Sequence, residues 1–162
     1  MTRTGMAHIM SSMSEHKAAI GGEYCGHFYF NDRWLDYDDG IYAAARTLEM
    51  LTEHVEDSHS FFAQFPKSLS TSELKIDIEE QHKEEFMKQL ITHAPVYIGG
   101  ELVQIDGLRI MHDDAWGLVR PSNTGPYLTL RFEAKTYSAM QNIKDAFGKL
   151  ITTINPSLVL PF

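Results

Sequence analysis

Cysteine and basic residues are scarce in this chain of 162 residues. Its single cysteine cannot form an internal disulfide, which is typical of proteins from a reducing compartment. Lysine and arginine number 14 against 22 aspartates and glutamates, so the sequence lacks the basic patch of a nucleic-acid-binding protein. No apolar run approaches the roughly 20 residues that cross a membrane, and the N-terminus lacks a signal-peptide core. We therefore expect a cytoplasmic protein that binds neither nucleic acid nor a membrane.

Residues 116–126 are expected to form a strand that runs into a polar turn. The turn places four side chains that can donate hydrogen bonds in one short loop: Arg120, Ser122, Asn123 and Thr124. An arginine fork, short hydroxyl and amide groups, and the backbone beside Gly125 are the donors that proteins use to hold a phosphate. The alternative is an ordinary turn, because Ser, Asn, Gly and Pro dominate turns for backbone reasons alone.

A second loop, rich in glycine, runs from Gly21 to His27. Its glycines permit a tight turn that could present the Glu23 carboxylate to sugar hydroxyls. His27 adds an imidazole, the side chain best suited to proton transfer near neutral pH. The alternative is a packed or surface histidine, and Asp38 and Asp39 have a sufficient role at the start of a helix.

In this order and at this separation, the two loops resemble the C-terminal part of the α-D-phosphohexomutases, in the bacterial phosphomannomutase/phosphoglucomutase branch. In that family a Gly-Glu-Met-Ser-Gly-His loop of the third domain reads the sugar. An Arg-x-Ser-Asn-Thr loop of the fourth domain grips the phosphate. Residues 22–27 and 120–124 correspond to these loops, and residues 38–42, 130–134 and 161–162 also look like that branch.

The resemblance assigns roles to residues of both loops. It implies that His27 is the candidate general acid/base and that Glu23 and Cys25 contact the sugar. For the substrate phosphate it implies a set of six residues: Arg120, Ser122, Asn123, Thr124, Gly125 and Arg131. Cys25 departs from the serine that is usual in the sugar loop, which replaces a hydroxyl by a weaker thiol donor. Met6 stands where many relatives carry a histidine.

The resemblance also implies a reaction for the whole enzyme, an isomerase that interconverts hexose 1-phosphate and hexose 6-phosphate of mannose or glucose. The family's phosphoserine loop and Mg²⁺ loop lie in earlier domains and are not found in this sequence. We therefore expect an inactive chain that binds phosphosugar, has no cofactor of its own and partners the missing N-terminal domains. Mg²⁺ and a hexose bisphosphate activator would belong to the full-length enzyme.

His54 and His59 lack a third ligand at a recognisable spacing, so no metal site is expected here.

Two other classes of function remain open. The first is a non-catalytic α+β interaction module in which the Arg120 loop binds an anion or a partner carboxylate, since such folds host many functions. The Glu23 and His27 loop favours the sugar-reading interpretation over this one. The second, weaker alternative is a free-standing hydrolase that uses His27 and Cys25, for which no partner of the histidine is identifiable.

Periodicity and composition predict the domains. A helix is expected at 39–53 with Asp38 or Asp39 as its cap, then a short helix at 58–65. Residues 65–72 are composed like a linker. We divide the chain into residues 1–66, the later part of a sugar-binding α/β domain, a hinge linker at 67–72, and a phosphate-binding α+β domain at 73–162. The first part should be the less stable one, because the earlier strands of such a domain are not found.

In the second domain, alternation predicts strands and helical spacing predicts two helices. The expected segments are strands at 74–78, 103–105, 108–112, 116–119 and 128–134, a helix with its apolar stripe at 86–91, and a last helix at 136–152. In outline the order is strand, helix, three strands, helix. It indicates an antiparallel sheet with helices packed on one face, and the phosphate loop joins two of its strands.

Overall fold

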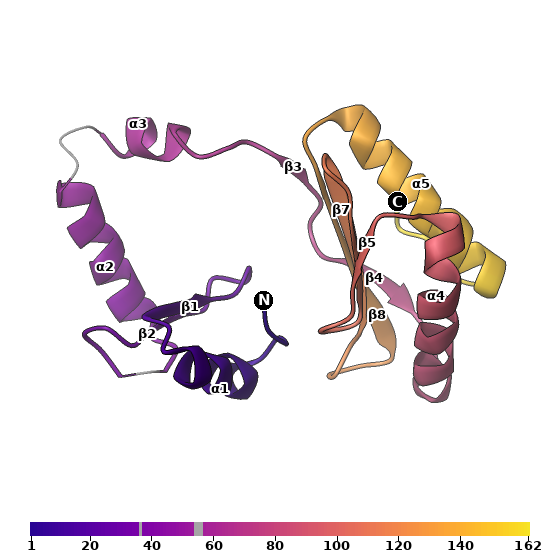
Figure 1. Ribbon diagram of the computed structural model, residues 1–162, viewed down its shortest axis with the longest axis horizontal. Helices are drawn as coiled ribbons and strands as arrows, with labels where there is room; N and C mark the ends of the chain where they lie inside the picture. Colours follow the sequence, from indigo (N-terminus) through magenta and orange to yellow (C-terminus); the bar gives the residue numbers. More distant parts are fainter. Residues whose placement is uncertain (36, 54–56) are drawn as a thin grey trace. The chain divides into compact units, whose positions relative to one another are not determined.

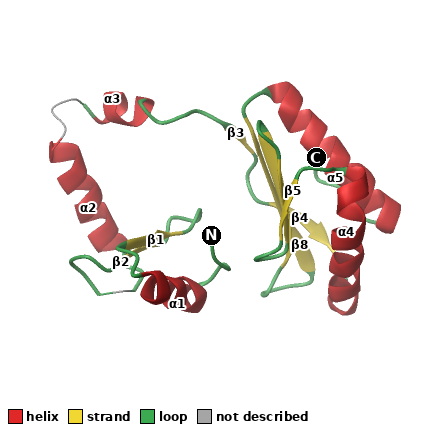
Figure 2. Cartoon of the chain, viewed as in Figure 1, coloured by secondary structure: helices red, strands yellow, loops and turns green. Residues whose placement is uncertain are grey.

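The computed structural model describes residues 1–35, 37–53 and 57–162, and it divides the chain into two compact units (Figures 1 and 2). Unit 1 comprises Met1–Pro66 and unit 2 comprises Lys67–Phe162. Each unit has its own cluster of buried apolar side chains. Within the described ranges, no helix is long and apolar enough to span a membrane.

The described residues of unit 1 form three helices and one hairpin. Its elements are α1 (Met6–His16), β1 (Ile20–Gly22), β2 (Phe28–Phe30), α2 (Gly40–Glu53) and α3 (Ser58–Ala63). The two strands pair antiparallel, with Gly22 opposite Phe28. Asp39 caps α2, because its Oδ1 accepts the backbone N–H groups of Ile41 and Tyr42 at 2.9 Å each. The expected helices at 39–53 and 58–65 are therefore present, and Asp39 rather than Asp38 is the cap.

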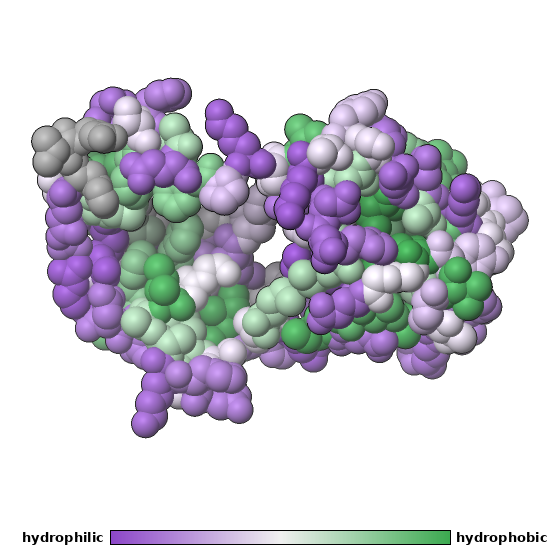
Figure 3. Space-filling model, turned by 45° about the horizontal axis from the view of Figure 1, so that its top comes forward, coloured by the Kyte–Doolittle hydropathy of each residue, from purple (hydrophilic) through white to green (hydrophobic). Residues whose placement is uncertain are grey.

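The apolar core of unit 1 is small. Ile9 and Met13 of α1 pack with Tyr29 of β2, and none of the residues of α2 is buried. Ile41 and Leu48 of α2 remain 87% and 64% exposed. Apolar side chains are accordingly open to view on this part of the molecule in the space-filling picture (Figure 3). Little apolar area leaves water when this unit folds, so its stabilisation by burial is limited.

We predict that unit 1 opens more readily than unit 2. Hydrogen-bonded amides of α1 and the β1–β2 hairpin should show protection factors at least about tenfold lower than those of α5 and the β7–β8 pair. Native-state hydrogen exchange of the whole chain measures both sets in one sample. Equal protection across residues 1–66 and 73–162 would contradict this prediction.

Unit 2 is an antiparallel sheet covered on one face by two helices (Figures 1 and 2). The strands are β3 (Leu69–Ser70), β4 (Leu74–Asp77), β5 (Glu101–Val103), β6 (Leu108–Met111), β7 (Ala115–Pro121) and β8 (Tyr127–Ala134). The helices are the short 3-10 helix η1 (Glu80–His82), α4 (Lys83–Tyr97) and α5 (Tyr137–Ile154). The strand order is β3-β8-β7-β6-β5, and β4 pairs with β8 as well. This architecture confirms the predicted α+β fold.

Alternation along β7 and β8 explains how the sheet packs on the helices. Leu128, Leu130 and Phe132 of β8 are fully buried. Phe132 makes edge-on ring contacts with Phe147 of α5 at 5.4 Å and with the C-terminal Phe162 at 5.0 Å. Beside these rings Gly117 of β7 has no room for a side chain, since a Cβ there would collide with the Phe147 ring. The intervening residues of both strands lie on the face away from α4 and α5.

Two details of unit 2 differ from the prediction. First, the later half of the expected linker is a strand: Leu69 and Ser70 of β3 pair with β8, and the Thr71 hydroxyl accepts the Phe132 N–H at 3.1 Å. This happens because β4 pairs only with residues 127–130 of β8 and leaves the end of that strand available to β3. Second, four strands lie between α4 and α5, one more than the outline order counted, although each of the four segments, including the β5–β6 hairpin, was predicted.

Candidate functional site

The predicted phosphate loop is the hairpin turn between β7 and β8. The Ser122 N–H donates to the Tyr127 carbonyl at 3.0 Å, and the Tyr127 N–H donates back to the Gly125 carbonyl at 2.9 Å. Inside the turn, Ser122 Oγ accepts the Thr124 N–H at 3.1 Å and lies 3.3 Å from the Thr124 hydroxyl. The Thr124 hydroxyl also lies 3.1 Å from that of Tyr127. Three hydroxyls thus gather in one short turn, with Asn123 exposed beside them.

Tyr127 is a member of this cluster that the sequence reasoning missed. The hydroxyls of Ser122 and, next, Thr124 lower the pKa of its phenol, and Lys75 lies 4.5 Å from its ring centre. Gly125 allows the ring to lie against the turn, because a Cβ at Gly125 would meet it at 2.7 Å. The sequence contained a signal for Tyr127: it lies four residues before Arg131, directly before the expected strand at 128–134, and residues at such spacing point to the same face of a sheet.

Lys83, the first residue of α4, is the second group that the sequence reasoning missed. Its side chain is buried, and its ammonium donates to the carbonyls of Ser122 at 2.7 Å and Gly125 at 3.0 Å. Glu80 lies 2.7 Å from the same nitrogen. Lys83 therefore binds both ends of the β7–β8 turn, which we call the phosphate turn after its predicted role. Helical spacing contained the signal, because Lys83 precedes Phe86 and Met87 by three and four residues on the buried face of α4.

Arginines line the sheet face that continues from this turn. Arg120 lies near the end of β7 with its Nη1 3.7 Å from Asp106 Oδ2, and its side chain is 23% exposed. Arg131 of β8 is opposite Leu118 and is buried. Arg109 of β6 stacks on the Trp116 ring at 4.0 Å, and burial lowers the pKa of its guanidinium. The register places these three arginines on the face away from the helices.

The predicted sugar loop connects β1 to β2 in unit 1. Past the Gly22–Phe28 pair, the Glu23 N–H donates to the His27 carbonyl at 2.9 Å, so these two residues lie opposite each other. The Gly26 N–H donates to the Glu23 carbonyl at 3.0 Å. Gly26 has a φ of 91°, a conformation that other residues rarely adopt. The hairpin therefore turns back sharply and gathers its polar side chains on one side.

Glu23 is the hub of this loop. Its Oε1 accepts the Gly5 N–H at 3.1 Å, and its Oε2 lies 3.1 Å from His27 Nδ1 and accepts the Tyr29 hydroxyl at 3.4 Å. Burial, and then the charge of Glu23, raises the pKa of Tyr29, which keeps this phenol a donor. The Glu23 side chain is only 10% exposed, whereas that of His27 is 52% exposed. Glu23 thus orients a more accessible His27.

The other predicted residues lie at the rim of the sugar loop. Cys25 is exposed, with its sulfur 3.4 Å from His27 Nδ1. Asp38 Oδ2 is 3.8 Å from the other ring nitrogen of His27, because Asp38 forms a β-bridge with Tyr29. Met6, the first residue of α1, is 55% exposed. The structure therefore brings Glu23, Cys25 and His27 together, with a carboxylate on either side of the imidazole.

Comparison with known proteins identifies the family of both units. Residues 1–69 match the family model for the phosphoglucomutase/phosphomannomutase alpha/beta/alpha domain III, and residues 69–150 match the model for the C-terminal domain. The chain belongs to the phosphoglucomutase/phosphomannomutase family. The predicted resemblance is therefore confirmed, and the two halves of the chain correspond to consecutive domains of the family.

Relatives from several bacteria cover the chain from end to end. It is 40% identical over 162 residues to a phosphomannomutase/phosphoglucomutase of Pseudomonas aeruginosa and 39% identical to a phosphoglucomutase of Neisseria gonorrhoeae. A crystal structure of a phosphoglucomutase/phosphomannomutase family protein from Burkholderia thailandensis superimposes with a TM-score of 0.89 at 37% identity. These matches cover 99–100% of the chain. The chain spans only 34–35% of the length of these relatives.

The Mg²⁺ of phosphohexomutases does not fit the ligands that this chain offers. In the described part of the chain, the group of three or more potential metal ligands is Glu23, Cys25 and His27. Mg²⁺ prefers oxygen ligands in octahedral geometry, whereas two of these three ligands are a thiol and an imidazole. These three residues are therefore not a ligand set that Mg²⁺ prefers.

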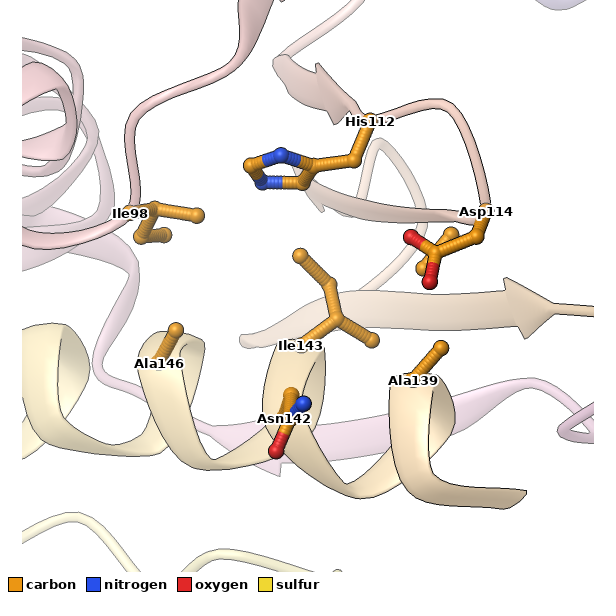
Figure 4. Close-up of a pocket in the computed structure, with 8 residues that line it drawn as sticks. Ile98, His112, Asp114, Ala139, Asn142, Ile143 and Ala146 are labelled. Atoms are coloured by element: carbon orange, nitrogen blue, oxygen red, sulfur yellow. The ribbon is translucent and has the colours of Figure 1, made fainter. Parts of the chain in front are cut away.

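A pocket of about 250 Å³ opens elsewhere in unit 2, between the β6–β7 turn and α5 (Figure 4). His112 and Asp114 approach it from the turn, while Asn142 and Ile143 approach it from α5 (Figure 4). The pocket lies beside Ala115 at the beginning of β7, and Arg120 lies near the other end of that strand. It is therefore separate from the phosphate turn.

Proposed function

We propose that this chain carries the sugar-recognition and phosphate-recognition loops of a phosphohexomutase. The whole enzyme would interconvert hexose 1-phosphate and hexose 6-phosphate of mannose or glucose, the reaction implied by relatives named phosphomannomutase/phosphoglucomutase. Phosphoryl transfer itself needs the phosphoserine and Mg²⁺ of other domains of that family. The isolated chain is accordingly expected to bind phosphosugar without turning it over.

The observation that carries this proposal is the β7–β8 turn. Arg120 offers a guanidinium fork to the phosphate, and the exposed Asn123 and Thr124 add neutral donors beside it. Lys83 holds the carbonyls of the turn from behind, which directs them away from the incoming anion. A phosphate gripped here lies away from the reacting centre. Binding energy of this kind holds a substrate in attacking geometry.

The sugar loop would act through His27 and the two carboxylates beside its ring, those of Glu23 and Asp38. An ionised carboxylate only accepts hydrogen bonds, so Glu23 orients the imidazole with its Nδ1 hydrogen directed inward. The half-exposed ring of His27 can then exchange a proton with a sugar hydroxyl. We propose that Cys25 contacts the sugar from the loop tip. The Glu23 side chain is only 10% exposed, so Glu23 would contact the sugar through the small exposed part of its carboxylate.

The Mg²⁺ and hexose bisphosphate of the proposed enzyme would be held by its other domains. When bound, Mg²⁺ supplies electrostatic stabilisation of the phosphoryl group in transfer. The part of this chain is to bind the non-reacting phosphate through residues 120–125 and to present the sugar hydroxyls to His27. Arg131 lies on the same sheet face as Arg120 and is proposed to add positive charge there.

An amide-shift titration of the 162-residue chain tests both loops in one experiment. Mannose 1-phosphate, glucose 6-phosphate and inorganic phosphate should each shift the amides of residues 120–125 saturably, because a phosphate is common to all three. The amides of residues 22–27 should respond to the two phosphosugars and not to inorganic phosphate. Free mannose is the control without a phosphate and should leave residues 120–125 unmoved. A phosphate turn silent to all three anions would instead favour a non-catalytic interaction module.

A further inference from the structure

The loop that connects β1 to β2 carries three potential metal ligands within a small volume. The Glu23 carboxylate, the Cys25 thiol and an imidazole nitrogen of His27 all lie within 4.8 Å of one another. Thiolate, imidazole and carboxylate are the ligands from which proteins build zinc sites. We propose that Glu23, Cys25 and His27 form a binding site for Zn²⁺ with an open fourth position.

The hairpin brings these ligands together through its backbone. Glu23 and His27 are cross-strand neighbours one step beyond the last pair of the ladder, so their side chains project from the same face. Gly26, with its positive φ, folds the loop tip back so that Cys25 approaches His27. The hairpin backbone itself therefore holds the three side chains close together.

The distances between ligand atoms suit a tetrahedral ion. Zn–S and Zn–N bonds of about 2.3 and 2.0 Å at tetrahedral angles separate a sulfur and a nitrogen ligand by about 3.5 Å, and a nitrogen and an oxygen ligand by about 3.3 Å. Cys25 Sγ lies 3.4 Å from His27 Nδ1, and that nitrogen lies 3.1 Å from Glu23 Oε2. Small side-chain movements would suffice to admit the ion.

Neighbouring groups already hold two of the ligands in position. The backbone N–H of Gly5 and the hydroxyl of Tyr29 donate to the Glu23 carboxylate. Asp38 Oδ2 lies 3.8 Å from His27 Nε2, where it can accept the ring hydrogen once Nδ1 binds the metal. A carboxylate behind a zinc-bound histidine fixes the tautomer and orients the ring. Asp38 would serve as such a positioning residue.

Zinc binding to this loop would release one proton. The Cys25 thiol loses its proton to solvent as the Zn–S bond forms. His27 binds the ion through Nδ1 and carries its ring hydrogen on Nε2, and Glu23 binds as the carboxylate. Three protein ligands leave one position for water. If the proposed function also holds, an ion here would compete with the sugar for Glu23 and Cys25. The site itself does not depend on that function.

The test is a titration of the 162-residue chain with Co²⁺ and Zn²⁺, compared with the Cys25→Ser variant. Co²⁺ reports a thiolate ligand by a sulfur-to-metal charge-transfer band and a tetrahedral site by intense visible bands. We expect both signals to saturate at one ion per chain and to be abolished by Zn²⁺ but not by excess Mg²⁺. The Cys25→Ser variant should lose the charge-transfer band and bind Zn²⁺ more weakly by about 100-fold or more. This loss exceeds the roughly 10–100-fold loss of affinity that is usual when a residue that only hydrogen-bonds to a metal ligand is replaced.

A matched control uses another exposed histidine of unit 1. The His59→Ala variant should bind Zn²⁺ like the parent, since His59 lies outside the hairpin loop, whereas His27→Ala should bind it as weakly as Cys25→Ser. Unchanged backbone amide spectra outside residues 22–28 would show that the variants remain folded. Zinc binding of equal strength in the parent, Cys25→Ser and His27→Ala chains, or the absence of a charge-transfer band in the parent, would overturn the proposal.

Discussion

Replacing Arg120 by alanine should weaken mannose 1-phosphate binding by this chain about 100-fold. Hydrogen bonds to charged groups contribute about 1.5–3 kcal/mol each, and a 100-fold loss corresponds to about 2.7 kcal/mol. Asp106 adds to the effect, because its carboxylate lies 3.7 Å from Arg120 and would remain beside the anion without the guanidinium. Some affinity should survive, since the backbone and hydroxyl donors of the turn are unaltered.

The same titration with two further variants separates the guanidinium fork from charge alone. Arg120→Lys keeps the positive charge without the planar fork, and we expect a loss of about tenfold. Arg3→Ala removes an exposed arginine of unit 1 and should leave the affinity unaltered. Affinities measured from the amide shifts of residues 121–125 serve for all variants. If Arg120→Ala bound phosphosugar as well as the parent chain, the turn would have no role in phosphate recognition.

Lys83→Met should lower the unfolding free energy of unit 2 by about 3 kcal/mol. The substitution keeps an apolar stem of similar length but leaves the carbonyls of Ser122 and Gly125 without the ammonium that they accept from. A buried acceptor that loses its donor costs about 1–3 kcal/mol, and here there are two such acceptors. The ion pair with Glu80 adds little to this figure, because the Glu80 side chain is 73% exposed.

Lys88→Met is the matched control for this substitution. Lys88 lies on the same helix and pairs with Glu84 at 2.8 Å, but both side chains are largely exposed. Its replacement should cost no more than about 0.5 kcal/mol. Urea unfolding followed by Trp116 fluorescence in a Trp34→Phe background reports unit 2, since the two tryptophans of the chain lie in different units. Equal destabilisation by the two variants would show that Lys83 does not support the turn.

Local pattern was enough to predict most helices and strands. Alternation at Leu74, Ile76 and Ile78 and the turn signal of Asp106 and Gly107 predicted a strand and a hairpin that the structure contains. Helical spacing likewise predicted α2 and α5. Such patterns arise because one face of each element must leave water, which is a property of neighbouring residues.

Pairings between distant segments could not be predicted in this way. Leu69 and Ser70 read as linker, because two residues carry no measurable period, and they become a strand only where β8 offers an unpaired edge. In the sequence, Lys83 looks like an ordinary residue at the start of a helix, because its hydrogen-bond partners, the carbonyls of Ser122 and Gly125, are some 40 residues away. Contacts of this kind exist only once the sheet has formed and α4 has packed against it.

The sequence by itself determined the family and the α+β class, and it located the two loops that we propose bind sugar and phosphate, because these follow from short motifs and local periodicity. Tertiary structure alone decided how the side chains of those loops are arranged. It made Glu23 a mostly covered hub between Gly5, Tyr29 and His27, and it made Lys83 the support of the phosphate turn. The physical reason is that burial and hydrogen-bond partners are set by segments that meet only when the chain folds.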